Sequence, residues 1–275
     1  MYFDHHVHPE HGPYHPGTYP LSWIEAYLEV GRTRGVVGIG LVEHGYRFRE
    51  AAGLLPTPWA EARCRYPLAA YTELCDTLRS DPRIAVGLEM DYVPGREEAI
   101  RAYLSRYRWD FVLGSVHWLG DFGLDVGEMK HRYAERPLLD LWREYYQTQI
   151  AMVASGLFDV VTHPDLPKLF GGPRPSEAEL LPLYRALVEA LADTRVALEL
   201  NTSGLRRPVR EMYPALPLLE LAARAGVPLV LASDAHEPEN VGYAFARARD
   251  LARRAGFREV MGFSGGERVR LPLEA

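Results

Sequence analysis

The chain has 275 residues, of which 47% are hydrophobic and 25% are charged, and this composition is ordinary for a globular protein. The formal net charge of -6 and the sequence pI of about 5.9 give no electrostatic reason to expect nucleic-acid binding. The two cysteines, Cys64 and Cys75, show no CxxC spacing and therefore indicate neither a disulfide framework nor a thiolate zinc site.

The sequence shows no sign of a membrane span or a targeting segment. No apolar run reaches the roughly 18 residues that a spanning helix needs. The N-terminal segment MYFDHHVH has no basic start and no apolar centre, so it does not resemble a signal peptide. We therefore expect a cytoplasmic protein whose partner is a small molecule rather than a membrane or a nucleic acid.

Short apolar runs alternate along the chain with longer amphipathic runs. The short runs are rich in β-branched residues and predict strands that are buried on both faces. In chain order these predicted strands are Met1–Val7, Val36–Val42, Ile84–Met90, Phe111–Val116, Val160–Thr162, Val196–Leu200, Val227–Leu231 and Glu259–Phe263.

The amphipathic runs between them predict helices. These helices are Trp23–Arg34, Arg96–Tyr107, Leu138–Ser155, Glu177–Ala192, Leu216–Ala225 and Val241–Ala255, and Leu68–Leu78 is a further candidate in the less regular stretch 46–83. Ser22 and Ser176 are expected N-caps, and Ser176 with Glu179 matches a capping box. Four glycines follow predicted helix ends, where a left-handed residue is usually needed: Gly35, Gly156, Gly226 and Gly256.

Alternating strands and helices predict a parallel sheet. About eight strands in 275 residues favour a closed barrel over an open doubly wound sheet. No glycine-rich phosphate loop follows the first strand, which argues against a dinucleotide-binding fold. The expected fold class is therefore α/β, a distorted TIM-like barrel.

Histidines and acids occur at or just after the C-terminal ends of most predicted strands. In a parallel barrel these ends meet on one face, where the active site forms. A single histidine at a strand end is more often a packing residue than a ligand, but so many on one face argue against chance. The residues in question are His6, His8, His44, Glu89, His117, His163, Asp234 and His236.

The residue types and spacings in this set indicate metal binding. His6 and His8 are two positions apart on a strand, so both side chains face the same side, and Asp234 and His236 repeat the spacing. Imidazole and carboxylate groups are ligands for zinc, iron or manganese. The ligands outnumber one tetrahedral site and imply two or three metals, two of which Glu89 can bridge.

Other histidines near the N-terminus are less clearly assigned. His5 is expected to point opposite to His6 and is interpreted as a non-ligand. His11 and His15 compete for one ligand position in the loop after the first strand.

Two loops supply candidate phosphate-binding groups. Arg206 and Arg207 follow the sixth predicted strand, and an arginine fork matches phosphate oxygens. Lys168, shortly after His163, is a second candidate. Loop arginines and lysines are more commonly solvated, so for each of these residues a phosphate contact and simple solvation both remain open.

The chain resembles the histidinol phosphatases of the PHP (polymerase and histidinol phosphatase) superfamily. The matching segments are DHHVH at 4–8, GLEMDYVPG at 87–95, DFVLGSVHWLG at 110–120, THPDLPKLFG at 162–171, NTSGLRRP at 201–208 and SDAHEPENVGYAF at 233–245. The resemblance covers nearly the whole length and implies a single PHP phosphoesterase domain over 1–275 with a distorted (β/α)7 barrel.

The resemblance also implies three metals held by nine ligands. The first metal would bind His6, His8, Glu89 and Asp234, the second Glu89, His117 and His163, and the third His15, His44 and His236. The family usually has Thr-Asp-His where this chain has Val42-Glu43-His44, so the acid before the ligand is one methylene longer. If that acid orients a ligand, the third site is altered.

The implied activity is hydrolysis of L-histidinol phosphate, a small phosphate monoester. Bound metals would lower the pKa of a water molecule, and Arg206 and Lys168 would neutralise phosphoryl charge. Asp234 or His236 would pass a proton to the leaving oxygen. The alternatives are a phosphoesterase for nucleotides or other small esters, and a non-catalytic metal-binding module.

Overall fold

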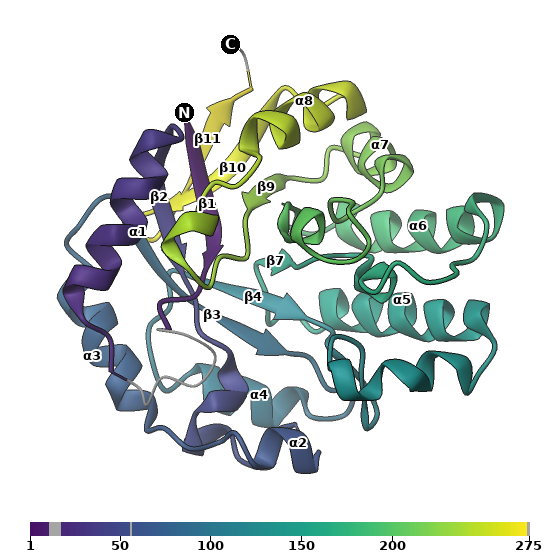
Figure 1. Ribbon diagram of the computed structural model, residues 1–275, viewed down its shortest axis with the longest axis horizontal. Helices are drawn as coiled ribbons and strands as arrows, with labels where there is room; N and C mark the ends of the chain where they lie inside the picture. Colours follow the sequence, from purple (N-terminus) through teal and green to yellow (C-terminus); the bar gives the residue numbers. More distant parts are fainter. Residues whose placement is uncertain (11–17, 56, 274–275) are drawn as a thin grey trace.

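Seven parallel strands form one sheet in the computed structural model, which describes residues 1–10, 18–55 and 57–273 (Figure 1). In spatial order the strands are β1 (Tyr2–Val7), β2 (Val36–Leu41), β3 (Ile84–Asp91), β4 (Phe111–Ser115), β7 (Val160–Val161), β8 (Ala197–Asn201) and β9 (Leu229–Ala232). A parallel bridge between Val7 and Ala235 brings the two edges together, and the His8 amide donates to the Ala235 carbonyl at 2.8 Å. The sheet is thus nearly closed, which confirms the distorted barrel.

Helices surround the sheet on its outer face (Figure 1). They are α1 (Leu21–Thr33), α3 (Leu68–Leu78), α4 (Glu97–Leu104), α5 (Leu138–Ala154), α6 (Glu177–Ala192), α7 (Leu216–Arg224) and α8 (Phe245–Ala255). The short helix α2 (Pro58–Glu61) lies instead in the segment between β2 and β3. None of the helices that the structure describes is long and apolar enough to cross a membrane.

The helix-end chemistry agrees with the sequence at most positions. Ser176 forms the predicted capping box with Glu179, because each side chain bonds the other's backbone amide. The four glycines predicted to follow helix ends all have positive φ, between 65° and 109°. The N-cap predicted at Ser22 is wrong, because α1 already begins at Leu21 after Pro20, so Ser22 lies in the first turn.

Buried apolar side chains form two main clusters on opposite faces of the sheet. The larger cluster joins the strands to the helices. The smaller one takes alternate strand residues, such as Ala85, Leu113 and Val230, and therefore lies inside the barrel. Met261 and Phe263, from the C-terminal part of the chain, complete this inner cluster, so the interior of the barrel is packed.

The last predicted strand lies outside the barrel. The run does form β10 (Glu259–Ser264), but β10 pairs antiparallel with β11 (Glu267–Pro272) in a hairpin, so the expectation of about eight barrel strands is wrong. Gly265 and Gly266, both with positive φ, turn the chain back at once. The apolar residues of Glu259–Phe263 correctly predicted a strand, but an apolar pattern does not specify which other strand it pairs with.

Gly204, in the turn after β8, occupies a position that excludes a side chain. A Cβ there would lie 2.1 Å from the Glu211 carbonyl oxygen and 2.9 Å from the Tyr213 ring. We therefore expect Gly204→Ala to lower the free energy of unfolding by about 1–3 kcal/mol, measured by denaturant titration. Gly172→Ala is the control, because no heavy atom lies within 4 Å of that Cβ. Equal stability of the two variants would contradict this placement of the turn.

Candidate metal centre

The eight described residues that the sequence placed at strand ends lie together at the C-terminal ends of the barrel strands. His6 and His8 come from the end of β1, Glu89 lies in β3, and the others follow β2, β4, β7 and β9. Three groups have ligand atoms within 4.8 Å of one another, namely His6 with His8 and Asp234, Glu89 with His117 and His163, and His8 with His44 and His236. His11 and His15, the two candidates for a loop ligand, lie outside the described residues.

Glu89 lies between these groups with its side chain 1% exposed. Its Oε2 atom is 2.7 Å from His44 Nδ1 and 3.4 Å from His6 Nε2, whereas its Oε1 atom is 3.3 Å from His163 Nε2. Burial alone would raise the pKa of this carboxyl, but His6, His44 and His117 hold it well below its usual range. Glu89 is therefore an ionised carboxylate whose two oxygens face different histidines, as a bridging ligand requires.

Four ligand atoms around His6 have the spacing of a tetrahedral metal site. His6 Nε2 lies 3.1 Å from His8 Nε2, 3.4 Å from Glu89 Oε2 and 3.8 Å from Asp234 Oδ1. His8 Nε2 lies 3.5 and 3.7 Å from the same two oxygens. Ligands about 2.0–2.2 Å from a tetrahedral metal are about 3.3–3.6 Å apart, so these residues fit a cation.

The protonation states of the two histidines also bear on this fit. Burial, His236 and His44 hold the pKa of His8 well below its usual range, which keeps the ring in the neutral form that binds metals. Burial also acts against protonation of His6, but Glu199, Glu89 and Asp234 raise the pKa of that ring well above its usual value. A cation at this point would replace the proton that the surrounding carboxylates attract.

Glu199 of β8 orients one ligand ring and supports another ligand's backbone. The His6 Nδ1–H group donates to Glu199 Oε1 at 2.7 Å, which leaves Nε2 facing Glu89. The His163 backbone amide and Asn201 Nδ2 both donate to Glu199 Oε2, at 2.7 and 3.0 Å. Carboxylates that hold the second nitrogen of a ligand histidine fix its tautomer and orientation.

Asp91 plays the same part for His117. The His117 Nδ1–H group donates to Asp91 Oδ1 at 2.9 Å. Burial opposes protonation, but Asp91 and nearby acids raise the pKa of His117 to about 10. Neither Asp91 nor Glu199 is among the site residues predicted from the sequence. The available signal was an acid inside a buried apolar strand, because a buried carboxylate needs a partner.

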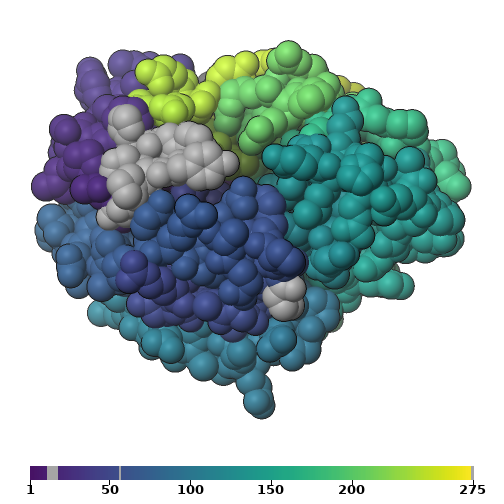
Figure 2. Space-filling model, turned by 60° about the horizontal axis from the view of Figure 1, so that its bottom comes forward, coloured from purple at the N-terminus to yellow at the C-terminus, as the bar shows by residue number. Residues whose placement is uncertain are grey.

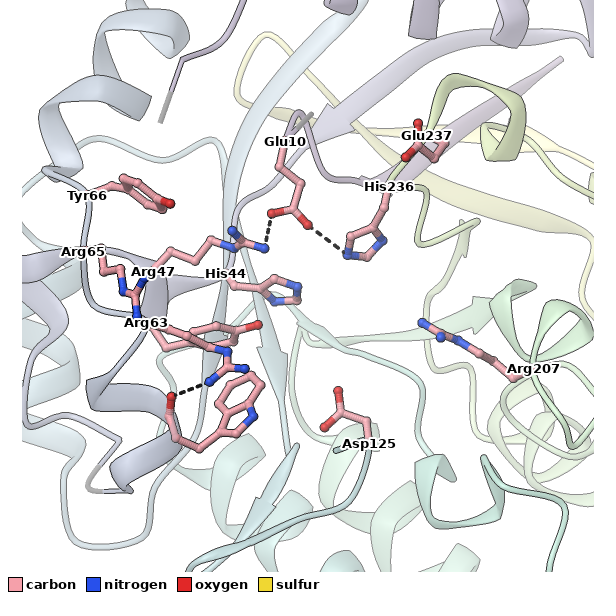
Figure 3. Close-up of a pocket in the computed structure, with 12 residues that line it drawn as sticks. Glu10, His44, Arg47, Arg63, Arg65, Tyr66, Asp125, Arg207, His236 and Glu237 are labelled. Carbon is pink, nitrogen blue, oxygen red and sulfur yellow. Dashed lines mark hydrogen bonds and ion pairs between the residues drawn. The ribbon is translucent and has the colours of Figure 1, made fainter. Parts of the chain in front are cut away.

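The His8, His44 and His236 rings stack at the pocket side of the centre. His8 lies 4.2 Å from each of the other two ring centres, with interplanar angles of 27° and 22°. Glu10, which the sequence analysis also missed, places Oε1 3.6 Å from His236 Nε2 and pairs through its other oxygen with Arg47 (Figure 3). Glu10 is thus a third carboxylate, after Glu199 and Asp91, that lies next to a histidine of this centre.

Glu43, the residue that departs from the family pattern, is fully buried next to the Glu10 and Arg47 pair. Its Oε2 atom lies 3.8 Å from Arg47 Nε. Burial and Glu10 raise the pKa of Glu43 well above its usual value, with Arg47 acting in the opposite direction. Glu43 is therefore connected to His236 by a chain of ion pairs, in which Arg47 contacts both Glu43 and Glu10, and Glu10 contacts His236.

His5 lies outside the ligand groups, and its side chain, predicted to point opposite to His6, enters the interior of the barrel. Its Nε2 atom accepts a hydrogen bond from the Phe263 amide at 2.7 Å, and its ring packs against Phe111 and Phe263 of the inner cluster. The pairing register of β1 shifts between Asp4 and Val7. This irregularity breaks the strict alternation on which the predicted orientation depended.

A pocket of about 730 Å³ opens above His44 and His236. Segments far apart in the sequence, drawn in purple, blue and green, meet on this side of the molecule (Figure 2). Figure 3 shows Arg207 on one wall and Asp125 facing the same space. The lining residues are Glu10, His44, Tyr46, Arg47, Trp59, Arg63, Arg65, Tyr66, Asp125, Arg207, His236 and Glu237.

Comparison with known proteins places this fold and site in a family. The PHP domain matches residues 4–203 of the chain. The chain belongs to the PHP family. A Deinococcus radiodurans protein named "Probable histidinol-phosphatase" is 36% identical over 266 residues, which are 94% of this chain and 95% of that protein. A Bacillus subtilis histidinol-phosphatase is 26% identical over 265 residues, covering 88% and 96% of the two chains.

A solved PHP structure has the same fold. The Lactococcus lactis histidinol phosphate phosphatase, crystallised with zinc, L-histidinol and phosphate, superposes with a TM-score of 0.75. The match covers 98% of both chains at 23% sequence identity. This likeness confirms the seven-stranded barrel, while the single domain over 1–275 stays a prediction.

The three phosphate-binding candidates of this PHP chain lie in different surroundings. Arg207 lines the pocket. Arg206 instead donates through Nη2 to the carbonyls of Ser233 and Asp234, at 2.8 and 3.0 Å. Lys168 is buried and binds Asp165 Oδ2 at 2.8 Å and the Met212 carbonyl at 2.7 Å. Lys168 therefore already has oxygen partners in the protein, and its phosphate role stays a prediction.

Proposed function

We propose that this protein is a metal-dependent phosphatase that hydrolyses L-histidinol phosphate to L-histidinol and phosphate in histidine biosynthesis. The observation that carries the proposal is the set of His6, His8, Glu89 and Asp234, whose facing atoms have metal-ligand spacing next to His44 and His236 of the pocket. The near full-length relative named as a histidinol-phosphatase supports the choice of substrate.

We assign three divalent or transition metal ions, zinc, iron or manganese, to the ligand groups. The first metal has His6, His8, Glu89 and Asp234, and the second has Glu89, His117 and His163. The third has His44 and His236 with His15 from the loop, and the proximity of His8 to both rings supports a metal there. When bound, such ions polarise phosphoryl oxygens and lower the pKa of water to near neutrality.

The remaining roles fall to groups around the pocket. Arg207 binds the phosphate, because its guanidinium lines the pocket and can neutralise oxygen charge. Arg206 holds the Asp234 carbonyl and so positions that residue. Asp234 Oδ1 faces His6, His8 and His236. Its other oxygen is our candidate for accepting a proton from the attacking water and passing that proton to the leaving oxygen, with His236 as the alternative.

The test is phosphate release from L-histidinol phosphate by purified protein loaded separately with Zn²⁺, Mn²⁺ or Fe²⁺. We expect turnover within the usual range of about 1–10³ s⁻¹ and a kcat/KM at least about tenfold above that for nucleoside monophosphates. Metal analysis of the same samples gives the number of bound ions. Bound metal without phosphate release under any condition would contradict the proposal and favour a non-catalytic module.

A further inference from the structure

Asp125 is a carboxylate on the pocket wall. It lies in the segment after the short hairpin of β5 (Trp118–Leu119) and β6 (Phe122–Gly123), close to the end of β4. Within the described ranges, no hydrogen bond or ion pair involves its side chain, whereas Glu10 in the same pocket pairs with Arg47. A charged group that lines a pocket unpaired is available to a ligand.

The backbone around Asp125 directs its side chain into the pocket. Its neighbours Leu124 and Val126 are 0% and 5% exposed and pack into apolar clusters, whereas Asp125 itself is exposed. The Leu124 amide donates to the His117 carbonyl at 2.8 Å, which ties this segment to the metal centre.

Arginines outnumber acids among the other charged residues of the pocket, where Glu10 pairs with Arg47 and Glu237 is the remaining acid. Arg63, Arg65 and Arg207 line the pocket, and Arg63 lies over the Trp59 ring at 3.6 Å from its centroid. Figure 3 shows Asp125 and Arg207 approaching the same space from neighbouring walls, with His44 beyond them. A ligand that carries both an anionic and a cationic group therefore finds a complementary charge for each in the same pocket.

L-histidinol phosphate is such a ligand, because it carries a phosphate and an ammonium group on neighbouring carbon atoms. We propose that Asp125 binds the substrate ammonium and thereby selects amino-alcohol phosphates, an inference that rests on the proposed function. A phosphate ester without a cationic group would instead place neutral or anionic atoms against this carboxylate. Asp125 thus contributes both attraction to the correct substrate and exclusion of other esters.

The deciding variant is Asp125→Asn, which keeps the size of the side chain and removes its charge. For L-histidinol phosphate we expect kcat/KM to fall by about tenfold to a hundredfold, mainly through KM, as for loss of a hydrogen bond between charged groups. For p-nitrophenyl phosphate, which has no ammonium, kcat/KM should stay the same or rise. The inhibition constant of L-histidinol should rise by a similar factor, while that of inorganic phosphate stays constant.

Two further variants make the result specific. Asp121→Asn alters an acid in the neighbouring turn that pairs with Arg132 outside the pocket, and it should leave both substrates unaffected. Glu237→Gln alters another acid that lines the pocket. If Glu237→Gln rather than Asp125→Asn weakens L-histidinol binding, the ammonium lies elsewhere. Equal loss for both esters in Asp125→Asn, or loss of metal, would also overturn the proposal, because Asp125 would then act through His117.

Failure of the proposed function has a separate signature. Wild-type protein would then cleave p-nitrophenyl phosphate but not L-histidinol phosphate. The inhibition constants of L-histidinol for wild type and Asp125→Asn still test the ammonium contact in that case. Equal constants would overturn the role of Asp125 independently of the substrate assignment.

Discussion

Glu89→Ala is expected to remove bound metal and to slow hydrolysis of L-histidinol phosphate by about 10³-fold, or about 4 kcal/mol of transition-state stabilisation. The reason is that Glu89 offers Oε2 to the His6 and His44 side of the centre and Oε1 to the His163 side. Alanine therefore removes a ligand from two groups at once. Metal-to-protein ratio and initial rates of phosphate release measure the effect.

The matched control for this variant is Glu98→Ala. Glu98 is an exposed acid in the first turn of α4, so its loss should change the rate by less than about twofold. Circular dichroism should show that Glu89→Ala keeps the secondary structure, since the barrel core does not depend on this side chain. An unchanged metal content and rate in Glu89→Ala would refute the shared-ligand arrangement.

Glu199→Gln is expected to weaken metal binding by about 10–100-fold. A glutamine amide offers one acceptor and one donor end, whereas Glu199 accepts at both ends, from His6 Nδ1 at one oxygen and from the His163 amide and Asn201 at the other. One of these donors must then face an NH₂ group. Competition with a chromophoric chelator gives the metal dissociation constants.

The same change should also lower the stability of the metal-free protein by about 1–3 kcal/mol, the cost of leaving a buried donor unsatisfied. Glu189→Gln, on the exposed face of α6, is the control for both measurements. If the folded variant binds metal as tightly as wild type, Glu199 supports the fold only and does not orient His6.

Several parts of this protein could be predicted from local pattern. The alternation of short apolar runs with amphipathic helical runs predicted a parallel barrel, because a strand that is buried on both faces needs helices outside it. Placing His6, His44, Glu89 and His163 at strand ends was sufficient to bring them together, since parallel strands present their carboxyl ends on one face. The chemistry of the ligands then indicated metal binding before any distance was known.

Other parts depended on contacts between distant segments. The β10 run has the composition of a barrel strand, yet it pairs with β11 below the barrel, because pairing is decided by the neighbouring chain and not by burial. Lys168 follows a strand-end histidine in the sequence, but its ammonium points to Asp165 and Met212. Arg206 and Arg207 are adjacent, and only the folded turn separates their surroundings.

For this protein, the sequence alone determined the barrel class, the metal-binding end and eight of the residues gathered there, because periodicity and strand polarity are local properties. Tertiary structure decided how those eight divide into groups, which carboxylates orient the histidines, and which charged side chains reach the pocket. Glu199 and Asp125 illustrate the difference. Each is an ordinary acid in the sequence. The contact of Glu199 with His6 joins residues 193 positions apart, and the proposed role of Asp125 rests on its place in the pocket wall.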